Sequence, residues 1–190
     1  AGMRKVVQTE AYQRIERAPC FVVCIGGYLD RFDILYKEDN TIKDSKEVRS
    51  YLQSKKKKLF SYEIFENLDL SKGNYEELEF QFSSFVGCNF TQSSWNKSHL
   101  LFSNLQNTML KNTKMEKMKI FDTDFSGATL EQVDFAGAKI KHVSFAGAKL
   151  IQVDFSKVLL AEEINFQDAQ IVDCKFPEEV GSGLLYHENR

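Results

Sequence analysis

The sequence predicts a mainly β solenoid preceded by a small mixed α/β module. Three observations predict it: an apolar residue at every fifth position, a small residue two places before most of these, and a change in charge along the chain. Residues 1–65 carry 13 Lys/Arg and 9 Asp/Glu, whereas residues 66–178 carry 11 and 16. Because the two regions differ in surface charge, we expect an N-terminal capping or docking module at 1–65, a solenoid at 66–178 and a tail at 179–190.

A period of five residues runs through the second region without a miss. Such a period fits neither an α-helix, with about 3.6 residues per turn, nor a strand, with a period of about 2. It fits a coil that turns a corner every quintet and points its fifth residue, position i, inward. Nineteen consecutive positions follow this rule: Leu70, Tyr75, Phe80, Phe85, Phe90, Trp95, Leu100, Leu105, Leu110, Met115, Ile120, Phe125, Leu130, Phe135, Ile140, Phe145, Leu150, Phe155 and Leu160.

The other positions of each quintet follow a pattern too. Position i−2 holds a small or modest residue, such as Ser83 or Thr123, so it must also point inward. Positions i−1, i+1 and i+2 are mostly polar, and we expect them, including Asp124, Asp134 and Asp154, to face water. The glycines of the AG and SG pairs are expected at corners, namely Gly127, Gly137 and Gly147.

Residues 125–155 read FSGATLEQVDFAGAKIKHVSFAGAKLIQVDF. This stretch resembles the pentapeptide-repeat family, whose motif is approximately A(D/N)LXX. The resemblance covers about residues 66–176 and implies a right-handed quadrilateral β-helix with four quintets per coil. Members of the family include topoisomerase-protecting proteins, bacterial effectors and many proteins of unassigned role, so the fold alone assigns no function.

Four quintets per coil place residues 20 apart in register and predict four interior ladders. After Leu160 the next inward residue is Phe166, so we expect one extra residue to bulge among residues 161–165, and Pro177 to end the pattern. The four ladders are Phe80, Leu100, Ile120, Ile140 and Leu160; Phe85, Leu105, Phe125 and Phe145; Phe90, Leu110, Leu130 and Leu150; and Trp95, Met115, Phe135 and Phe155.

The N-terminal region is expected to contain a helix over residues 4–17, a hairpin over 20–36 and a second helix that begins at Asp44. The four lysines of 55–58 follow this second helix, where cations favour a helix C-terminus. That interpretation is preferred over a nucleic-acid or lipid patch, because no second basic cluster accompanies the run. The apolar face of the second helix consists of Val48, Tyr51 and Leu52.

The sequence offers no candidate catalytic, cofactor-binding or metal-binding residue. His99, His142 and His187 fit no triad or metal-ligand spacing, and Cys88 and Cys174 occupy small inward positions, which favours inert packing. We therefore expect a protein that is not an enzyme and needs no cofactor. An enzyme with its site in the N-terminal module is the remote alternative.

Four large apolar residues break the rule that positions i+1 and i+2 are polar. Phe82 and Phe102 lie at i+2 and 20 residues apart, while Leu101 and Phe121 lie at i+1. The register predicts that these four project outward side by side, and exposed apolar patches mark interfaces. Either residues 1–65 fold back over this candidate interface, or a homodimer or a foreign protein covers it.

The function that these features favour is a non-catalytic interaction or scaffold module that presents a rigid face to a protein partner. No apolar run is long enough to cross a bilayer, and we expect a cytoplasmic protein, with secretion as a bacterial effector left open. Direct nucleic-acid binding is not expected at a net charge of −2. The alternative is a DNA mimic that binds or protects a type II topoisomerase (DNA gyrase). Mimicry requires a continuous negative surface, which a block of lysines interrupts, namely Lys111, Lys114, Lys117 and Lys119.

Overall fold

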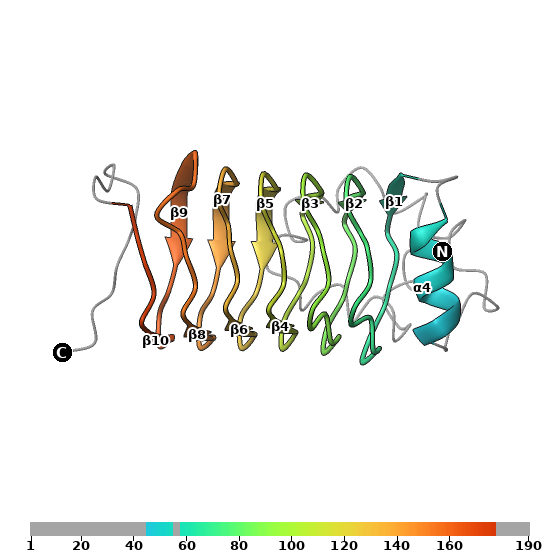
Figure 1. Ribbon diagram of the computed structural model, residues 1–190, viewed down its shortest axis with the longest axis horizontal. Coiled ribbons are helices and arrows are strands. Elements are labelled where there is room, and N and C mark those ends of the chain that lie inside the picture. The colour runs from blue at the N-terminus through green and yellow to red at the C-terminus, as the bar shows by residue number, and fades with distance from the viewer. Residues whose placement is uncertain (1–44, 55–57, 178–190) are drawn as a thin grey trace, which may run out of the picture. The chain divides into compact units, whose positions relative to one another are not determined.

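The computed structural model describes residues 45–54 and 58–177, which form a short helix and a stack of β-coils (Figure 1). The helix is α4 (Ser45–Gln53), and the strands form two parallel sheets. The helix expected over 4–17 and the hairpin expected over 20–36 lie outside the described residues.

The strands are short because each coil changes direction after a few residues. The larger sheet has the order β1-β2-β3-β5-β7-β9, and the smaller has the order β4-β6-β8-β10. The larger sheet consists of β1 (Leu59–Ser61), β2 (Glu79–Gln81), β3 (His99–Leu101), β5 (Lys119–Asp124), β7 (Lys139–Ser144) and β9 (Leu160–Asn165). The smaller consists of β4 (Met109–Lys111), β6 (Thr129–Glu131), β8 (Lys149–Ile151) and β10 (Gln170–Val172).

Neighbouring strands pair with residues 20 apart over most of the stack, as four quintets per coil require. Phe80 lies opposite Leu100, and Leu100 lies opposite Ile120. In the smaller sheet Leu110 lies opposite Leu130. The inward side chains fill the centre of the coils, where residues such as Phe125 have no exposed surface. The predicted mainly β solenoid of pentapeptide-repeat type is therefore confirmed.

Each corner of a coil is made by the residue at position i+2. From Tyr62 to Gln152, and again at Glu163, Asp168 and Asp173, these residues have φ between 49° and 71°, in the left-handed region. The glycines predicted at corners follow this rule, with φ of 68° at Gly127 and 71° at Gly137. Asp or Asn at position i−1 supports the next corner, because its Oδ1 accepts a hydrogen bond from the backbone N–H two residues on, at 2.8 Å for Asp124.

The stack begins before the predicted boundary at residue 66. β1 pairs with β2, and Phe60 lies opposite Phe80 with their rings stacked at 5.1 Å. Position 60 fits the five-residue register, so the first coil includes residues that were expected in the N-terminal module. The division into a module, a solenoid and a tail otherwise remains a prediction, because residues 1–44 and 178–190 lie outside the described part.

The prediction for Leu160 was wrong. Leu160 lies opposite Lys139, and the residue opposite Ile140 is Ala161. The extra residue is therefore inserted before Ala161 and not among residues 161–165. The corner at Lys157 also departs from the left-handed φ of the preceding corners. The extra residue leaves Leu159 turned outward, where it is 70% exposed.

The expectation that Asp124 faces water was also wrong. Its side chain is 3% exposed, although it occupies an outward position. Asp124 accepts hydrogen bonds from the Ser126 N–H at 2.8 Å and from Gln106 Nε2 at 2.5 Å. A buried carboxylate requires such partners, and the neighbouring polar side chains supply them.

Helix α4 packs against the first coil. Its Val48 and Leu52 are buried, as predicted, and the ring of Tyr51 meets Phe60 edge on at 5.3 Å. Arg49 Nη2 donates a hydrogen bond to the Asp69 carbonyl at 2.9 Å. Because the end of a solenoid exposes apolar side chains and unpaired backbone groups, these contacts make α4 a cap for the coils.

Candidate interaction surface

An apolar ridge runs along one corner of the stack, and we define it as Tyr62, Phe82, Leu101, Phe102 and Phe121. The rings of Tyr62 and Phe82 stack at 5.2 Å, and those of Phe82 and Phe102 stack at 5.0 Å, each pair 8° from parallel. Leu101 lies opposite Phe121 in the β3 and β5 register. All five side chains are half-buried. The geometry thus places the four predicted residues side by side.

Tyr62 was missing from the predicted interface. It stands 20 residues before Phe82 at the same corner, but the five-residue count began at Leu70 and did not extend to it. The signal that could have found it is Phe60, which fits the inward position two residues earlier. Extending the register to residue 60 places Tyr62 at i+2 of the preceding coil, next to Phe82 in the stack.

The backbone of the ridge is unfavourable for bulky side chains. Tyr62, Phe82 and Phe102 have φ of 61°, 51° and 51°. A left-handed conformation costs a residue with a Cβ atom about 1–2 kcal/mol, and the other left-handed corners hold glycine or polar residues. Three aromatic residues therefore stand where the backbone favours small ones, although stacking of their rings offsets part of that cost.

Beyond Phe102 the same corner changes from apolar to charged. The next corner residues are Asp122, His142 and Glu163. His142 Nδ1 lies 3.0 Å from Asp122 Oδ1, and His142 Nε2 lies 3.4 Å from Glu163 Oε2. The imidazole thus bridges two carboxylates of neighbouring coils on an exposed edge.

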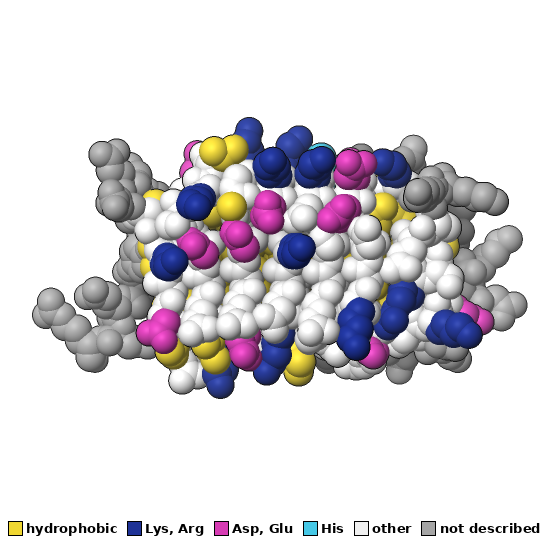
Figure 2. Space-filling view, in the orientation of Figure 1, with side chains coloured by type: hydrophobic (Ala, Val, Ile, Leu, Met, Phe, Trp, Pro, Cys, Tyr) yellow, Lys and Arg dark blue, Asp and Glu magenta, His cyan; other side chains and the backbone are white. Residues whose placement is uncertain are grey.

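Acidic and basic side chains alternate on the coils. Figure 2 shows Asp/Glu and Lys/Arg side chains interspersed over one face, with uncharged surface between them. Lys111 pairs with Glu131 at 2.9 Å, and Lys141 pairs with Glu162 at 3.0 Å. Asp154 is engaged in its own corner, where hydrogen bonds from Ser156 lower the pKa of its carboxyl. The carboxylates on this face do not form a continuous acidic surface.

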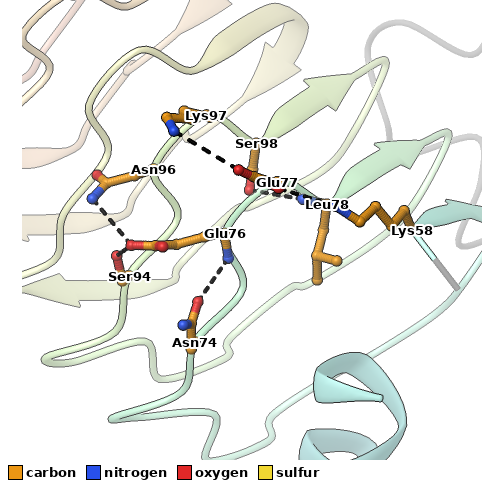
Figure 3. Close-up of polar contacts among 9 residues, drawn as sticks. All are labelled: Lys58, Asn74, Glu76, Glu77, Leu78, Ser94, Asn96, Lys97 and Ser98. Atoms are coloured by element: carbon orange, nitrogen blue, oxygen red, sulfur yellow. Dashed lines mark hydrogen bonds and ion pairs between the residues drawn. The ribbon is translucent and has the colours of Figure 1, made fainter. Parts of the chain in front are cut away.

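Glu76 and Glu77 illustrate how acidic residues join neighbouring coils (Figure 3). Glu77 lies between Lys58, at 3.0 Å, and Lys97, at 3.8 Å. The hydrogen bond from Lys58 lowers the pKa of the Glu77 carboxyl. Glu76 Oε1 accepts a hydrogen bond from Asn96 Nδ2 at 3.2 Å. Both carboxylates thus have partners on adjacent coils.

The two cysteines of the coils have poorly reactive thiols. Cys88 is fully buried, and burial raises the pKa of its thiol to about 12. Cys174 is half-buried, and burial raises the pKa of its thiol as well. A raised pKa lowers the fraction of thiolate, which is the nucleophilic form. The interpretation of these positions as packing residues agrees with this chemistry.

The described residues contain no group of three or more His, Cys, Asp or Glu side chains that could hold a metal ion. Among the same residues, no helix is both long and apolar enough to span a bilayer. The catalytic, cofactor and location assignments therefore remain predictions.

Comparison with known proteins bears on the family. Residues 88–166 match the model of the pentapeptide repeat region. None of the curated proteins compared with the sequence matches it. Two trypsin-treated variants of QnrB1, a plasmid-mediated fluoroquinolone resistance protein, have similar structures. They are 19% and 18% identical to this chain, with TM-scores of 0.54 and 0.55, and each match covers 63% of this chain and 60% of the other.

A pentapeptide repeat protein from the Arabidopsis thaliana thylakoid lumen is 17% identical, with a TM-score of 0.48, over 60% of this chain and 73% of that one. At these identities the similarities to QnrB1 show the fold alone, and they span less than two thirds of its length. Together with the matched family model and the four-quintet coils, they confirm the resemblance found in the sequence. Residues 88–166 of this chain are a pentapeptide repeat region, and the described coils have the fold of pentapeptide-repeat proteins.

Proposed function

We propose that this protein is a non-catalytic interaction module that binds a protein partner through the apolar ridge. The observation that carries the proposal is the run of aromatic residues at left-handed corners. Left-handed φ is shared by nearly every corner of the coils, so the aromatic side chains are what distinguishes the ridge. Half-exposed apolar groups side by side are typical of protein interfaces. The expected partner surface is apolar, with a recess or side chains that pack against stacked rings.

The coils supply the rigidity that such a surface needs. Each ridge residue is held by backbone hydrogen bonds to the next coil, as when the Phe102 N–H donates to the Phe121 carbonyl at 3.0 Å. A surface that is already ordered loses little conformational entropy on binding. A rigid ridge therefore favours recognition of a preformed partner surface.

Replacing Phe102 by aspartate is expected to weaken partner binding by about 30-fold or more, because aromatic hot spots contribute about 2 kcal/mol or more. The backbone tolerates the change, since Asp122 already occupies the next corner with φ of 51°. To find the partner, a photo-crosslinking amino acid is placed at position 102, and cells that express this variant are irradiated. The crosslinked protein is the candidate partner. The affinity of the purified partner is then measured by calorimetry.

Asn112 is the matched control, because it is an exposed corner residue with the same φ of 51° on another side of the coil. The crosslinker at position 112 should not capture the same protein, and Asn112→Asp should leave its affinity unchanged. Crosslinks from position 102 to a second copy would make the ridge a homodimer contact. Crosslinks to residues 1–44 alone would contradict the proposal, as would unchanged affinity of the Phe102→Asp protein.

The topoisomerase alternative makes a different prediction. A DNA mimic presents carboxylates in place of phosphates along a continuous surface, whereas the ion pairs of Glu77, Glu131 and Glu162 place lysines beside carboxylates. We therefore expect neither inhibition nor protection of DNA gyrase at micromolar protein in a supercoiling assay with and without a fluoroquinolone. A dose-dependent effect would support mimicry instead.

A further inference from the structure

Five lysines gather along another corner of the stack, and we call this group the basic edge: Lys97, Lys117, Lys119, Lys139 and Lys157. Lys119 of β5 lies opposite Lys139 of β7 in the strand register. Backbone hydrogen bonds stack the corners, because Lys117 N–H donates to Ala136 O and Gly137 N–H donates to Lys157 O. Residues that are 60 positions apart in the sequence are thereby brought to one edge.

Four of these lysines form no ion pair with a carboxylate among the described residues, although the charge of Lys157 contributes to the lowered pKa of Asp154. All five are exposed. Within residues 58–177, Lys97 is the only one of the five that makes an ion pair, at 3.8 Å to Glu77. Like charges directly opposite each other destabilise a sheet, so the Lys119 and Lys139 pair opposes folding. An arrangement that opposes folding but concentrates positive charge is suited to binding an anion.

The corner that follows Lys117 in the stack is formed by a glycine, Gly137. A Cβ atom at Gly137 would lie 3.1 Å from Lys117 Cγ. Glycine at this position therefore leaves room for the Lys117 side chain to lie against the next coil. In Figure 2, dark blue side chains line the upper edge, above the strands labelled β3, β5 and β7 in Figure 1.

An exposed apolar residue adjoins the basic edge. The inserted residue before Ala161 turns Leu159 outward to 70% exposure. The Leu159 N–H donates to the Ala138 carbonyl at 2.8 Å, next to Lys139. Figure 2 shows hydrophobic side chains at the end of the row of lysines. The basic edge thus combines several cations with one projecting apolar side chain.

We propose that the basic edge binds an acidic segment of a partner protein, with an apolar side chain of that segment against Leu159. Lys97 to Lys157 spans three coil spacings, or about 14 Å at about 4.8 Å each, which an extended segment of about four residues matches. A long polyanion fits less well, because carboxylates border the basic edge. Glu77 pairs with Lys97 at one end. Two residues after Lys139 in β7, Lys141 pairs with Glu162, which is followed by Glu163. This proposal rests on other side chains than the apolar ridge and is independent of it.

The test uses the full-length protein and a fluorescent decapeptide of alternating glutamate and leucine. Fluorescence anisotropy should show binding that weakens as salt is added, since salt screens exposed charges. The double variant Lys119→Glu and Lys139→Glu should lower the affinity by about tenfold or more. Leu159→Ser should lower it by about threefold to tenfold, the effect of removing one apolar contact.

The matched control is the double variant Lys114→Glu and Lys149→Glu, which makes the same charge change at two exposed lysines outside the basic edge. It should keep the wild-type affinity, and circular dichroism melts should show that both double variants fold. Equal losses in the two double variants, or no peptide binding by the wild type, would overturn the proposal. Tighter binding of a ten-nucleotide oligothymidine, or of vesicles rich in phosphatidylserine, would assign the edge to nucleic acid or membrane instead.

Discussion

Replacing Phe125 by alanine is expected to lower the free energy of unfolding by about 3–5 kcal/mol, the usual loss for a buried phenylalanine. Phe125 has no exposed surface, and its ring stacks on that of Phe145 at 5.2 Å. It lies in the middle of the stack, where each coil contacts only its neighbours. A cavity there weakens the contacts on both sides, and urea denaturation followed by circular dichroism measures the loss.

The matched control is Phe102→Ala, which removes the same ring from an outward position. Phe102 is half-buried and contacts Phe82 in the ridge, so its loss is expected to cost about 1 kcal/mol. The two variants separate inward from outward positions with one chemical change. Similar losses at both sites would contradict the assignment of the ridge as surface and of position i as core.

The five-residue period was sufficient to predict the coils because it is a packing requirement. Each coil must place a large side chain directly above that of the coil before it, so Phe80, Leu100 and Ile120 share one register. A single apolar residue out of place would leave a void or a clash. The period therefore predicts which residues are core over nearly the whole stack.

The slip at Ala161 could not be predicted from the same rule. Leu159, Leu160 and Ala161 are all apolar, so a count of apolar residues cannot decide which of them continues the inward ladder. The structure places Ala161 opposite Ile140 and leaves Leu159 exposed. Backbone pairing with β7 decides the register here, and it is a non-local interaction that the local pattern does not encode.

The candidate surfaces were predictable to different degrees. The ridge followed from the register, because Phe82 and Phe102 break the polar rule at i+2. The basic edge was less visible, since Lys97 and Lys157 lie far apart in the sequence and meet only when the coils are stacked. The burial of Asp124 was hidden too, because an aspartate at i−1 has the same sequence pattern whether or not it is covered.

Gly73→Ala is expected to lower the free energy of unfolding by about 2–4 kcal/mol, from overpacking and the loss of a buried hydrogen bond. A Cβ atom at position 73 would lie 2.2 Å from the Tyr75 ring and hydroxyl. Tyr75 has no exposed surface, and its hydroxyl donates to the Leu70 carbonyl at 2.9 Å. The ring cannot move aside easily, because it also packs against Trp95 at 5.0 Å.

The control for this variant is Gly147→Ala. No heavy atom lies within 4 Å of a Cβ atom built there, but its φ of 62° is unfavourable for alanine. Its expected cost is only the backbone strain, about 1 kcal/mol. Thermal melts of both proteins compare a steric clash in the core with backbone strain at a corner. A smaller loss for Gly73→Ala than for Gly147→Ala would show that the Tyr75 ring adjusts, and that the first coils are packed less tightly than the contacts of Tyr75 require.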